Sequence, residues 1–349
     1  MTLRRFLLRS LAVLAGLVLV TTALAGALWL YFHPTVADVR RIPYGQRHGQ
    51  ELAYDVVRPE NPNGLGVALM VSGSWKSGTN SFRPWMTAPL LRRGYTILAV
   101  YHVSQPTATV AEIFDDVSRA VRHIRHHARE HGIDPTRLGV TGGSAGGHLS
   151  LLLATRGVAG PAEATDPVDR ESCAVQAVAI FYPVTDLLNL GASTENLHDG
   201  GPPKSFVKAF RPQPGGPTNW TDLGRSLSPI FHVHPRTPPT LIYHGDADTL
   251  VPLDQSQRYQ ARAREVGPEV ELVVHPGGGH GWLTMLWDIR HFAEWFDRHL
   301  RPGGTDVRAS LPDEGSGKSV LGTPRPAGLD RWPAWPPPRL PTFPEARPG

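Results

Sequence analysis

Short apolar runs alternate with longer amphipathic stretches through the middle of the chain. Runs typical of buried strands cover residues 67–71, 95–103, 138–141, 174–182, 240–244 and 270–275. Between them, the pattern predicts helices over residues 85–93, 109–131, 145–155, 253–266 and 282–300. The earlier segment LAYDVV predicts one more strand, which ends before the turn NPNG. Buried strands that alternate with helices indicate a mostly parallel sheet covered on both faces, so we predict the α/β class.

The N-terminal end of the chain has a different pattern. Arg4, Arg5 and Arg9 precede an uncharged and overwhelmingly apolar run over residues 11–32, which is long enough to span a bilayer as a helix. The arginines favour a cytoplasmic N-terminus, with the rest of the chain outside. The alternative is a secretory signal peptide, because the small residues at 23–25 fit a cleavage site. The apolar run continues beyond that site, which favours an uncleaved anchor, and both interpretations export the domain.

Two further segments complete the domain organisation. Residues 184–239 are rich in Gly and Pro, and they predict a cap-like insertion above the sheet. Residues 301–349 have abundant Pro and little apolar periodicity, which predicts a mostly disordered tail; docking of a protein partner on WPAWPPP is the alternative. We therefore divide the chain into an anchor or signal segment (1–35), an α/β domain (36–300) and the tail.

Composition narrows the classes of function. The chain has 349 residues, of which 40% are hydrophobic and 19% are charged, as expected for a globular domain with additions. The net charge of +4 arises from scattered arginines without an aromatic and basic module, so nucleic-acid binding is not predicted. The one cysteine, Cys173, cannot form an internal disulfide and is predicted to pack beside a strand.

A cluster of glycines marks the junction between the expected strand at 138–141 and the helix at 145–155. In TGGSAGG, four glycines surround Ser144 and Ala145, and glycine permits turns that strain other residues. A Gly-x-Ser-x-Gly match between a strand and a helix is the pattern of a nucleophile elbow. Such an elbow presents the serine hydroxyl at the top of the sheet, beside a helix N-terminus. An ordinary tight turn is the alternative.

A serine nucleophile requires a histidine base and an acid that orients the histidine. Asp246 and Asp248 follow the expected strand at 240–244, and His280 lies in a glycine-rich loop after the next strand. The carboxyl ends of parallel strands meet at one edge of a sheet, and the order serine, acid, histidine is the one expected there. His148 follows the serine too closely to serve as the base, so we predict that it packs on the nucleophile helix.

These motifs resemble those of the serine α/β-hydrolases, especially the BD-FAE-like branch with carbohydrate and feruloyl esterases. The matching parts are GVTGGSAGGHLSLLLA, SLSPIFHVHPRTPPTLIYHGDADTLVP and GGGHGW. The resemblance implies an α/β-hydrolase fold with Ser144 as nucleophile, Asp248 as acid and His280 as base, while Asp246 stabilises its turn. A mechanism with these groups needs no metal or organic cofactor.

The family usually has a His-Gly-Gly loop whose backbone N–H groups help to form the oxyanion hole. This chain has MVSGSWKSG instead, with Val71 in the place of the histidine. Because the useful donors are backbone groups, we expect the N–H groups of Gly73, Ser74 and Ala145 to form the hole. We expect Trp75 to line an acyl or sugar pocket.

Three histidines, His123, His127 and His131, share one face of the expected helix at 109–131. Zinc could bind to such a face. However, four arginines on the same helix oppose a cation, and no carboxylate or cysteine completes a recognisable site. We therefore expect a solvated polar face and no metal.

The sequence predicts an exported, membrane-anchored serine carboxylic ester hydrolase that acts on a small-molecule ester through an acyl-enzyme. One alternative is a serine peptidase of the prolyl-oligopeptidase type, which shares a similar core but has a propeller-length region that we do not expect here. Another alternative is a non-catalytic, hydrolase-like module that binds a protein partner through the Pro-rich tail. The residues do not define the acyl or the alcohol group of the substrate.

Overall fold

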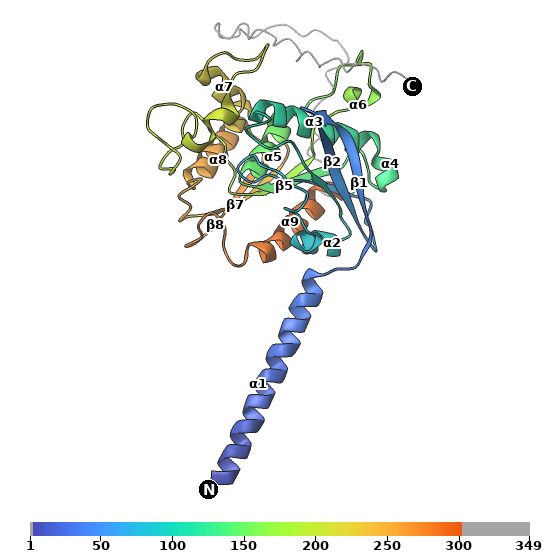
Figure 1. Cartoon of the computed structure of the whole chain (residues 1–349), viewed down its shortest axis with the longest axis vertical. Helices are drawn as coiled ribbons and strands as arrows, with labels where there is room; N and C mark the ends of the chain where they lie inside the picture. Colours follow the sequence, from blue (N-terminus) through green and yellow to red (C-terminus); the bar gives the residue numbers. More distant parts are fainter. Residues whose placement is uncertain (1–2, 302–349) are drawn as a thin grey trace, which may run out of the picture.

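The computed structural model describes residues 3–301, and most of the predicted tail lies outside this range. Eight strands form one sheet in the order β1-β2-β4-β3-β5-β6-β7-β8 (Figure 1). The strands are β1 (Val36–Arg47), β2 (Gln50–Pro59), β3 (Gly66–Met70), β4 (Thr96–Val100), β5 (Leu138–Gly143), β6 (Ala177–Phe181), β7 (Thr240–Gly245) and β8 (Val270–His275). β2 pairs antiparallel with both β1 and β4, and all other neighbours are parallel. This sheet confirms the predicted α/β class and α/β-hydrolase fold.

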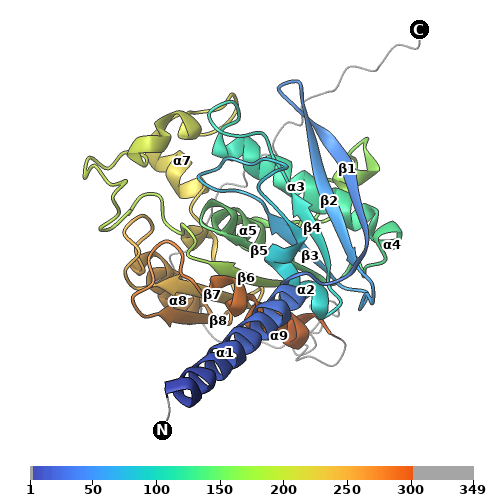
Figure 2. The ribbon, with the colours of Figure 1, turned by 60° about the horizontal axis from the view of Figure 1, so that its bottom comes forward.

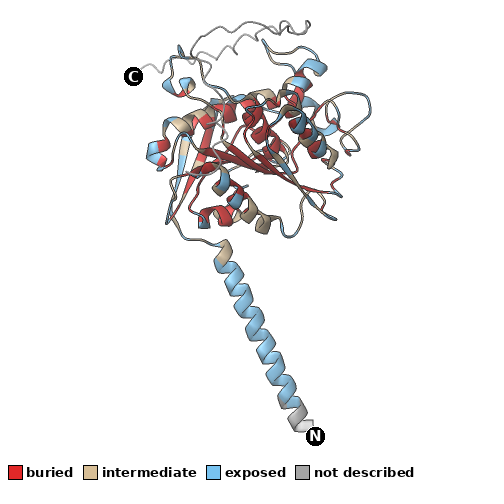
Figure 3. Ribbon diagram, turned by 180° about the vertical axis from the view of Figure 1, so that it is seen from behind, coloured by how far each residue is buried: buried red, intermediate tan, exposed pale blue. Residues whose placement is uncertain are grey.

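Helices cover both faces of the sheet. The longer helices of the domain are α3 (Val110–His126), α5 (Ala145–Arg156), α8 (Asp254–Val266) and α9 (Met285–Leu300), and the short ones include α2 (Ala88–Arg92), α4 (Ala128–His131) and α6 (Pro167–Arg170). α3, α5 and α8 contribute to one apolar core, whereas α2 and α9 contribute to the core on the opposite face. Figure 3 shows the buried residues concentrated in the sheet and in the helix faces beside it.

Local sequence accounts for the limits of several elements. α3 begins with a capping box, in which the Thr109 side chain accepts a hydrogen bond from the Glu112 N–H and the Glu112 side chain accepts one from the Thr109 N–H. The expected single helix over 109–131 is interrupted at His127, and its last turn, α4, ends at Gly132 with a φ of 70°. β3 to β7 are almost completely buried and mostly apolar, because both of their faces are covered.

α1 (Leu3–Phe32) projects away from the domain (Figure 1). Its span Arg9–Phe32 is 24 residues long, has a mean hydropathy of 2.3 and is 0% buried, so it could cross a bilayer as an anchor or serve as a signal sequence. Its last turn contacts the domain beside α2 and α9 (Figure 2). There the Tyr31 ring lies 4.9 Å from the Trp287 ring of α9, and Arg92 of α2 donates a hydrogen bond of 2.6 Å to the Tyr31 carbonyl.

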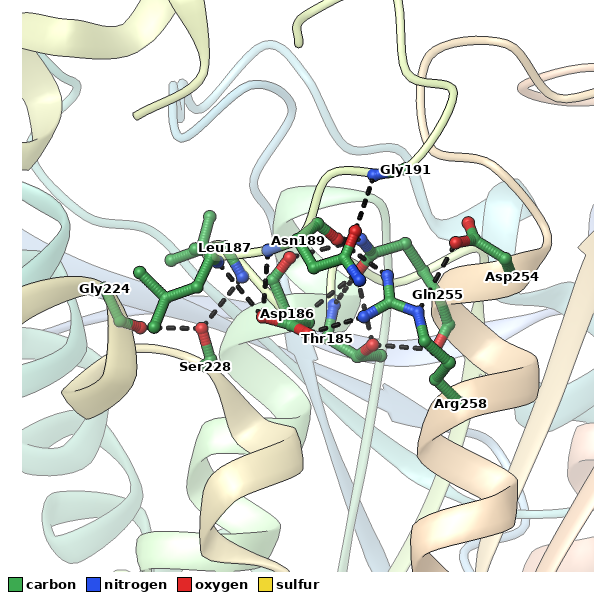
Figure 4. Close-up of polar contacts among 11 residues, drawn as sticks. Thr185, Asp186, Leu187, Asn189, Gly191, Gly224, Ser228, Asp254, Gln255 and Arg258 are labelled. Carbon is green, nitrogen blue, oxygen red and sulfur yellow. Dashed lines mark hydrogen bonds and ion pairs between the residues drawn. The ribbon is translucent and has the colours of Figure 1, made fainter. Parts of the chain in front are cut away.

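The segment between β6 and β7 contains η2 (Lys204–Phe210), α7 (Trp220–Ser226) and η3 (Pro229–His232). Gln255 of α8 holds its beginning (Figure 4). The Gln255 Oε1 accepts hydrogen bonds from the N–H groups of Thr185 and Asp186, and its Nε2 donates to the carbonyls of Asp186 and Asn189. Arg258 adds an ion pair of 2.5 Å to the Asp186 carboxylate. The first residues of the segment are thus fixed to the helix that follows the Asp248 loop.

Candidate active site

Ser144 lies on a tight turn between β5 and α5, with φ 55° and ψ −120°. This backbone conformation is costly for any residue other than glycine, and such strain is concentrated at functional sites. The flanking glycines are needed for close packing. A Cβ at Gly142 would lie 2.6 Å from the Gly146 carbonyl carbon, and one at Gly146 would overlap the Met70 carbonyl oxygen of β3. The glycine cluster therefore lets α5 approach the strands closely while Ser144 points out of the turn.

The structure brings Ser144, His280 and Asp248 together. His280 Nε2 lies 2.9 Å from Ser144 Oγ, and His280 Nδ1 lies 2.7 Å from Asp248 Oδ2. In the arrangement that uses both contacts, the serine O–H donates to Nε2 and the histidine Nδ1–H donates to the carboxylate. The three residues follow β5, β7 and β8, whose carboxyl ends lie at one edge of the sheet.

Asp248 is held as a carboxylate by several donors. Its Oδ1 accepts hydrogen bonds from the N–H groups of Leu250 (2.9 Å) and Val251 (3.0 Å), and its side chain is fully buried. Burial by itself raises the pKa of this carboxyl, but the neighbouring His244 and His280 and the Val251 N–H outweigh burial and lower the pKa well below its ordinary value. A permanently ionised acid can orient His280 and stabilise its protonated form.

Asp246 occupies a different position from Asp248, although only one residue separates them. It is exposed, and its Oδ1 accepts a hydrogen bond of 2.6 Å from the Gly277 N–H in the loop after β8. Asp246 therefore connects the turn after β7 to the loop that carries His280. The geometry leaves Asp248 as the carboxylate that contacts the histidine.

In the loop at residues 73–76, which we call the oxyanion loop, the backbone N–H of Gly73 is not free as expected. The Gly73 N–H donates a hydrogen bond of 3.0 Å to the Lys76 carbonyl, so it is not an available donor. In the described part of the chain, the N–H groups of Ser74 and Ala145 have no hydrogen-bond partner. A bond of 3.0 Å from the Gly146 N–H to the Ser72 carbonyl holds this loop against the start of α5. Two of the three expected donors, on Ser74 and Ala145, are thus free to bind an oxyanion.

The prediction that Trp75 lines a substrate pocket is wrong in this structure. Its side chain is 3% exposed, and its ring packs against Phe206 and Phe210 of η2. Its Nε1 donates a hydrogen bond of 3.1 Å to Nδ1 of His148, whose Nε2 lies 2.7 Å from the Leu227 carbonyl. Trp75 therefore connects the oxyanion loop to α5 and to the segment after β6. His148 packs on the nucleophile helix, as predicted, and burial lowers its pKa to about 4.

Sequence reasoning missed two residues beside the site. The first is His102, which follows β4 and is buried; its Nε2 lies 2.9 Å from Ser72 Oγ, and its Nδ1 lies 2.9 Å from the Val103 carbonyl. The second is Tyr182, which has a φ of 30° and places its ring 4.4 Å from the His280 ring. No motif marks either residue, although Tyr182 directly follows β6 and His102 comes two residues after β4, and both strands end at the same edge of the sheet.

A pocket of about 920 Å³ adjoins this site on the α2 and α9 face of the sheet. Its lining includes Ser72, Gly73 and Gly143 near the nucleophile, and Tyr182 and Trp282 near His280. Most other lining side chains are apolar and come from β3, η1 (Pro84–Thr87), α2 and the beginning of α9. Within the described residues, none of the expected insertion at 184–239 lines this pocket.

The prediction that His123, His127 and His131 form a solvated polar face is also wrong. The Tyr54 hydroxyl of β2 lies 3.0 Å from His123 Nδ1 and 2.8 Å from His131 Nε2. His131 is buried and His123 is half-buried, while His127 pairs with Glu130 at 2.9 Å. Burial lowers the pKa of both His123 and His131 to about 4. The two histidines therefore belong to a buried polar contact between α3, α4 and the sheet.

The eight-stranded sheet and the serine on the turn between β5 and α5 define an α/β-hydrolase fold. The chain belongs to the BD-FAE family, whose model matches residues 55–262. Among solved structures, an acetyl ester-xyloside bifunctional hydrolase from Caldicellulosiruptor lactoaceticus is 26% identical with a TM-score of 0.58, and covers 74% of this chain and 93% of its own. A truncated carbohydrate esterase from gut microbiota, at 22% identity and a TM-score of 0.60, covers 76% of this chain and 98% of its own and shares the fold.

Curated relatives are named as esterases. The chain is 32% identical to Esterase LipQ of Mycobacterium tuberculosis over 271 residues, which cover 73% of this chain and 59% of LipQ. It is 25% identical to the acetylxylan esterase of Xylanibacter ruminicola over 246 residues, which cover 69% of this chain and 44% of that protein. The chain thus spans about half the length of these relatives.

Proposed function

We propose that the chain is a serine carboxylic ester hydrolase that acts through an acyl-enzyme and is held outside the cytoplasm by α1. The observation that carries this proposal is the continuous line of hydrogen bonds from Asp248 through His280 to Ser144, at 2.7 and 2.9 Å. The names of the relatives LipQ and acetylxylan esterase support ester hydrolysis as the reaction. The apolar span Arg9–Phe32 of α1, with Arg4 and Arg5 before it, supports the anchor.

In this proposal, Ser144 Oγ attacks the ester carbonyl carbon while His280 Nε2 accepts the hydroxyl proton. The carbonyl oxygen becomes an oxyanion, which the N–H groups of Ser74 and Ala145 stabilise. The bond to the alcohol then breaks, and His280 returns its proton to the departing alkoxide. Asp248 stays ionised throughout and stabilises the histidinium.

A water molecule completes the reaction. It gives a proton to His280 and attacks the acyl carbon, and the second oxyanion is stabilised by the same two N–H groups. Collapse of this intermediate breaks the bond to Ser144 Oγ, which recovers its proton from His280. The products are a carboxylic acid and an alcohol, and the free enzyme is regenerated.

The test is hydrolysis of p-nitrophenyl acetate by the full chain in detergent, compared with its Ser144→Ala variant. Both proteins are also treated with a fluorophosphonate, which labels an activated serine. We expect hydrolysis and labelling in the wild type and loss of both in the variant. A matched p-nitroanilide distinguishes peptidase chemistry, because preferential amide cleavage would contradict the proposal. A folded wild type with neither activity nor labelling would also contradict it.

A further inference from the structure

The apolar pocket and the end of α1 lie on the same face of the sheet. One wall of the pocket is formed by η1 and α2, and the other by the first turn of α9. Figure 2 shows the end of α1 beside α2 and α9. Arg92 of α2 donates a hydrogen bond to the Tyr31 carbonyl, and Trp287 of α9 packs against Tyr31 and Phe32, so the last turn of α1 contacts both helices. Trp287 directly follows Met285 and Leu286, which line the pocket. An anchor in α1 would therefore hold the walls of this pocket beside the bilayer.

An exposed leucine lies at the edge of the pocket. Leu283, in the loop between His280 and α9, lines the pocket and yet is 101% exposed. Trp85 and Met86 of η1 also line the pocket and are half-buried. Exposed apolar side chains that gather at one place indicate a contact surface, and tryptophan is favoured where a protein meets the membrane interface. Contact with a bilayer at this edge would remove Leu283 from water.

The other end of the pocket lies next to the reacting groups, although Ser144 and His280 are not among its lining residues. Gly143 precedes Ser144 directly, and the Tyr182 ring lies 4.4 Å from the His280 ring. Between this end and Leu283 the lining is mainly apolar, with Leu69, Val71, Phe82, Leu90, Phe181 and Ile289 among its side chains. A volume of about 920 Å³ is at the upper end of the range, about 300–1,000 Å³, of pockets that bind drug-sized ligands. The pocket is therefore large enough for a long hydrocarbon chain.

We propose that this pocket binds the long acyl chain of an ester that resides in the membrane, and that the chain enters past Leu283. The proposal rests on the ester hydrolase function proposed above. The acyl group suits this pocket better than the alcohol, because the acyl group stays covalently attached to Ser144 after the alcohol has left. Each methylene that leaves water for an apolar environment strengthens binding by a factor of about four, and the bilayer and the pocket offer the chain the same gain. An apolar pocket beside the bilayer therefore accepts a long chain without exposing its methylenes to water.

The test uses the full chain in vesicles of an ether-linked phosphatidylcholine, which contains no acyl ester. The substrates are p-nitrophenyl acetate, octanoate and palmitate, and the measured quantity is the ratio of kcat/KM for palmitate to that for acetate. Acetate turnover in the same sample reports whether each variant is folded. We expect kcat/KM to rise from acetate to palmitate.

Two variants examine the pocket and its entrance. Met86→Trp fills the pocket and is expected to lower the ratio by about tenfold or more, since it displaces several methylenes. Leu283→Glu places a charge at the entrance and is expected to lower the ratio about as much; its full exposure leaves folding unaffected. The matched control is Leu197→Glu, an exposed leucine in the segment after β6, which should leave the ratio unchanged.

The outcomes separate the two proposals. Serine-dependent cleavage of acetate with a kcat/KM that falls as the chain lengthens would overturn the acyl-chain inference and leave the hydrolase function standing. If Leu283→Glu lowers the ratio no more than Leu197→Glu does, entry of the chain from the membrane is overturned. No serine-dependent cleavage of any of the three esters would overturn the hydrolase function, and the acyl-chain inference with it.

Discussion

His102 accepts a hydrogen bond from Ser72: its Nε2 lies 2.9 Å from Ser72 Oγ, and both side chains are buried. Because His102 Nδ1 faces the Val103 carbonyl at 2.9 Å, this nitrogen carries the proton and Nε2 is the acceptor. The Ser72 carbonyl in turn accepts the Gly146 N–H of α5. A histidine that follows β4 thus fixes the residue next to the oxyanion loop, although Val71 stands where the family histidine would be.

We predict that Ser72→Ala lowers kcat about tenfold and changes KM little. The substitution leaves His102 Nε2 buried without a partner and frees the loop that carries the Ser74 N–H. The loss should be smaller than the hundredfold or more that follows removal of a complete oxyanion donor. Steady-state hydrolysis of p-nitrophenyl acetate measures both parameters. Ser72→Thr, which keeps the hydroxyl, should recover most of kcat, and equal losses in the two variants would contradict a role for this hydrogen bond.

The backbone of Ser144 predicts a difference between two inactive variants. Both Ser144→Ala and Ser144→Gly remove the hydroxyl, but only glycine adopts a φ of 55° with a ψ of −120° without strain. After allowance for the greater freedom of glycine in the unfolded chain, Ser144→Gly should be more stable than Ser144→Ala by about 0.5–2 kcal/mol. Urea unfolding followed by tryptophan fluorescence measures the difference. Equal stabilities would mean that the turn stores no strain.

Asp248 and Asp246 provide a matched pair on one turn. Asp248→Asn should lower kcat/KM by about three to four orders of magnitude, because the carboxylate no longer orients His280 or stabilises its charge. Asp246→Asn should change kcat/KM by no more than about threefold. The Asp246 side chain accepts a hydrogen bond from the Gly277 N–H, whereas the contact with His280 belongs to Asp248. Hydrolysis of p-nitrophenyl acetate distinguishes them. If Asp246→Asn lost more activity than Asp248→Asn, Asp246 would be the acid that orients His280, and the prediction would be wrong.

The low pKa of Asp248 also predicts how this pair depends on pH. A carboxyl whose pKa is lowered on folding contributes stability above its unfolded pKa, near 3.9, and loses that contribution as the pH falls toward the folded pKa. The stability difference between wild type and Asp248→Asn should therefore be largest near neutral pH and should shrink below about pH 4. Urea unfolding at neutral and acidic pH measures this change, and Asp246→Asn supplies the comparison.

The order of strands and motifs allowed the triad to be predicted from sequence. Ser144 and Asp248 follow strands that are buried because both faces are covered, and His280 follows the partly exposed edge strand β8. Parallel topology brings the carboxyl ends of these strands to one edge of the sheet. Sequence could not distinguish Asp248 from Asp246 by pattern alone. The distinction depends on which carboxylate faces His280, and the Leu250 and Val251 N–H groups fix that orientation.

Features that depend on distant partners were not predictable from local pattern. Trp75 is buried because η2, more than a hundred residues later, covers its ring, and His131 is buried because Tyr54 of β2 supplies its hydrogen bond. The availability of the Gly73 N–H depends on a local turn to Lys76 that its sequence does not specify. The edge strand β1 was missed because half of its twelve residues are exposed and its sequence does not alternate regularly between apolar and polar residues.

Two buried histidines predict that the protein loses stability in mild acid. Burial lowers the pKa of His102 and of His148 to about 4, from an ordinary value of about 6.5. Between these values the unfolded chain binds more protons than the folded one, so the free energy of unfolding falls as the pH falls below about 6.5. Each buried histidine contributes a slope of up to about 1.4 kcal/mol per pH unit.

The slope is measured by urea unfolding of the wild type and of His148→Gln, between about pH 5 and pH 8. In this variant the glutamine amide could still donate to the Leu227 carbonyl and accept from Trp75, but it does not titrate, so the variant should lose stability less steeply in acid. If His148→Gln has the same slope as the wild type, His148 does not remain neutral in the folded protein. Its contacts with Trp75 and Leu227 would then have to accommodate a charged ring.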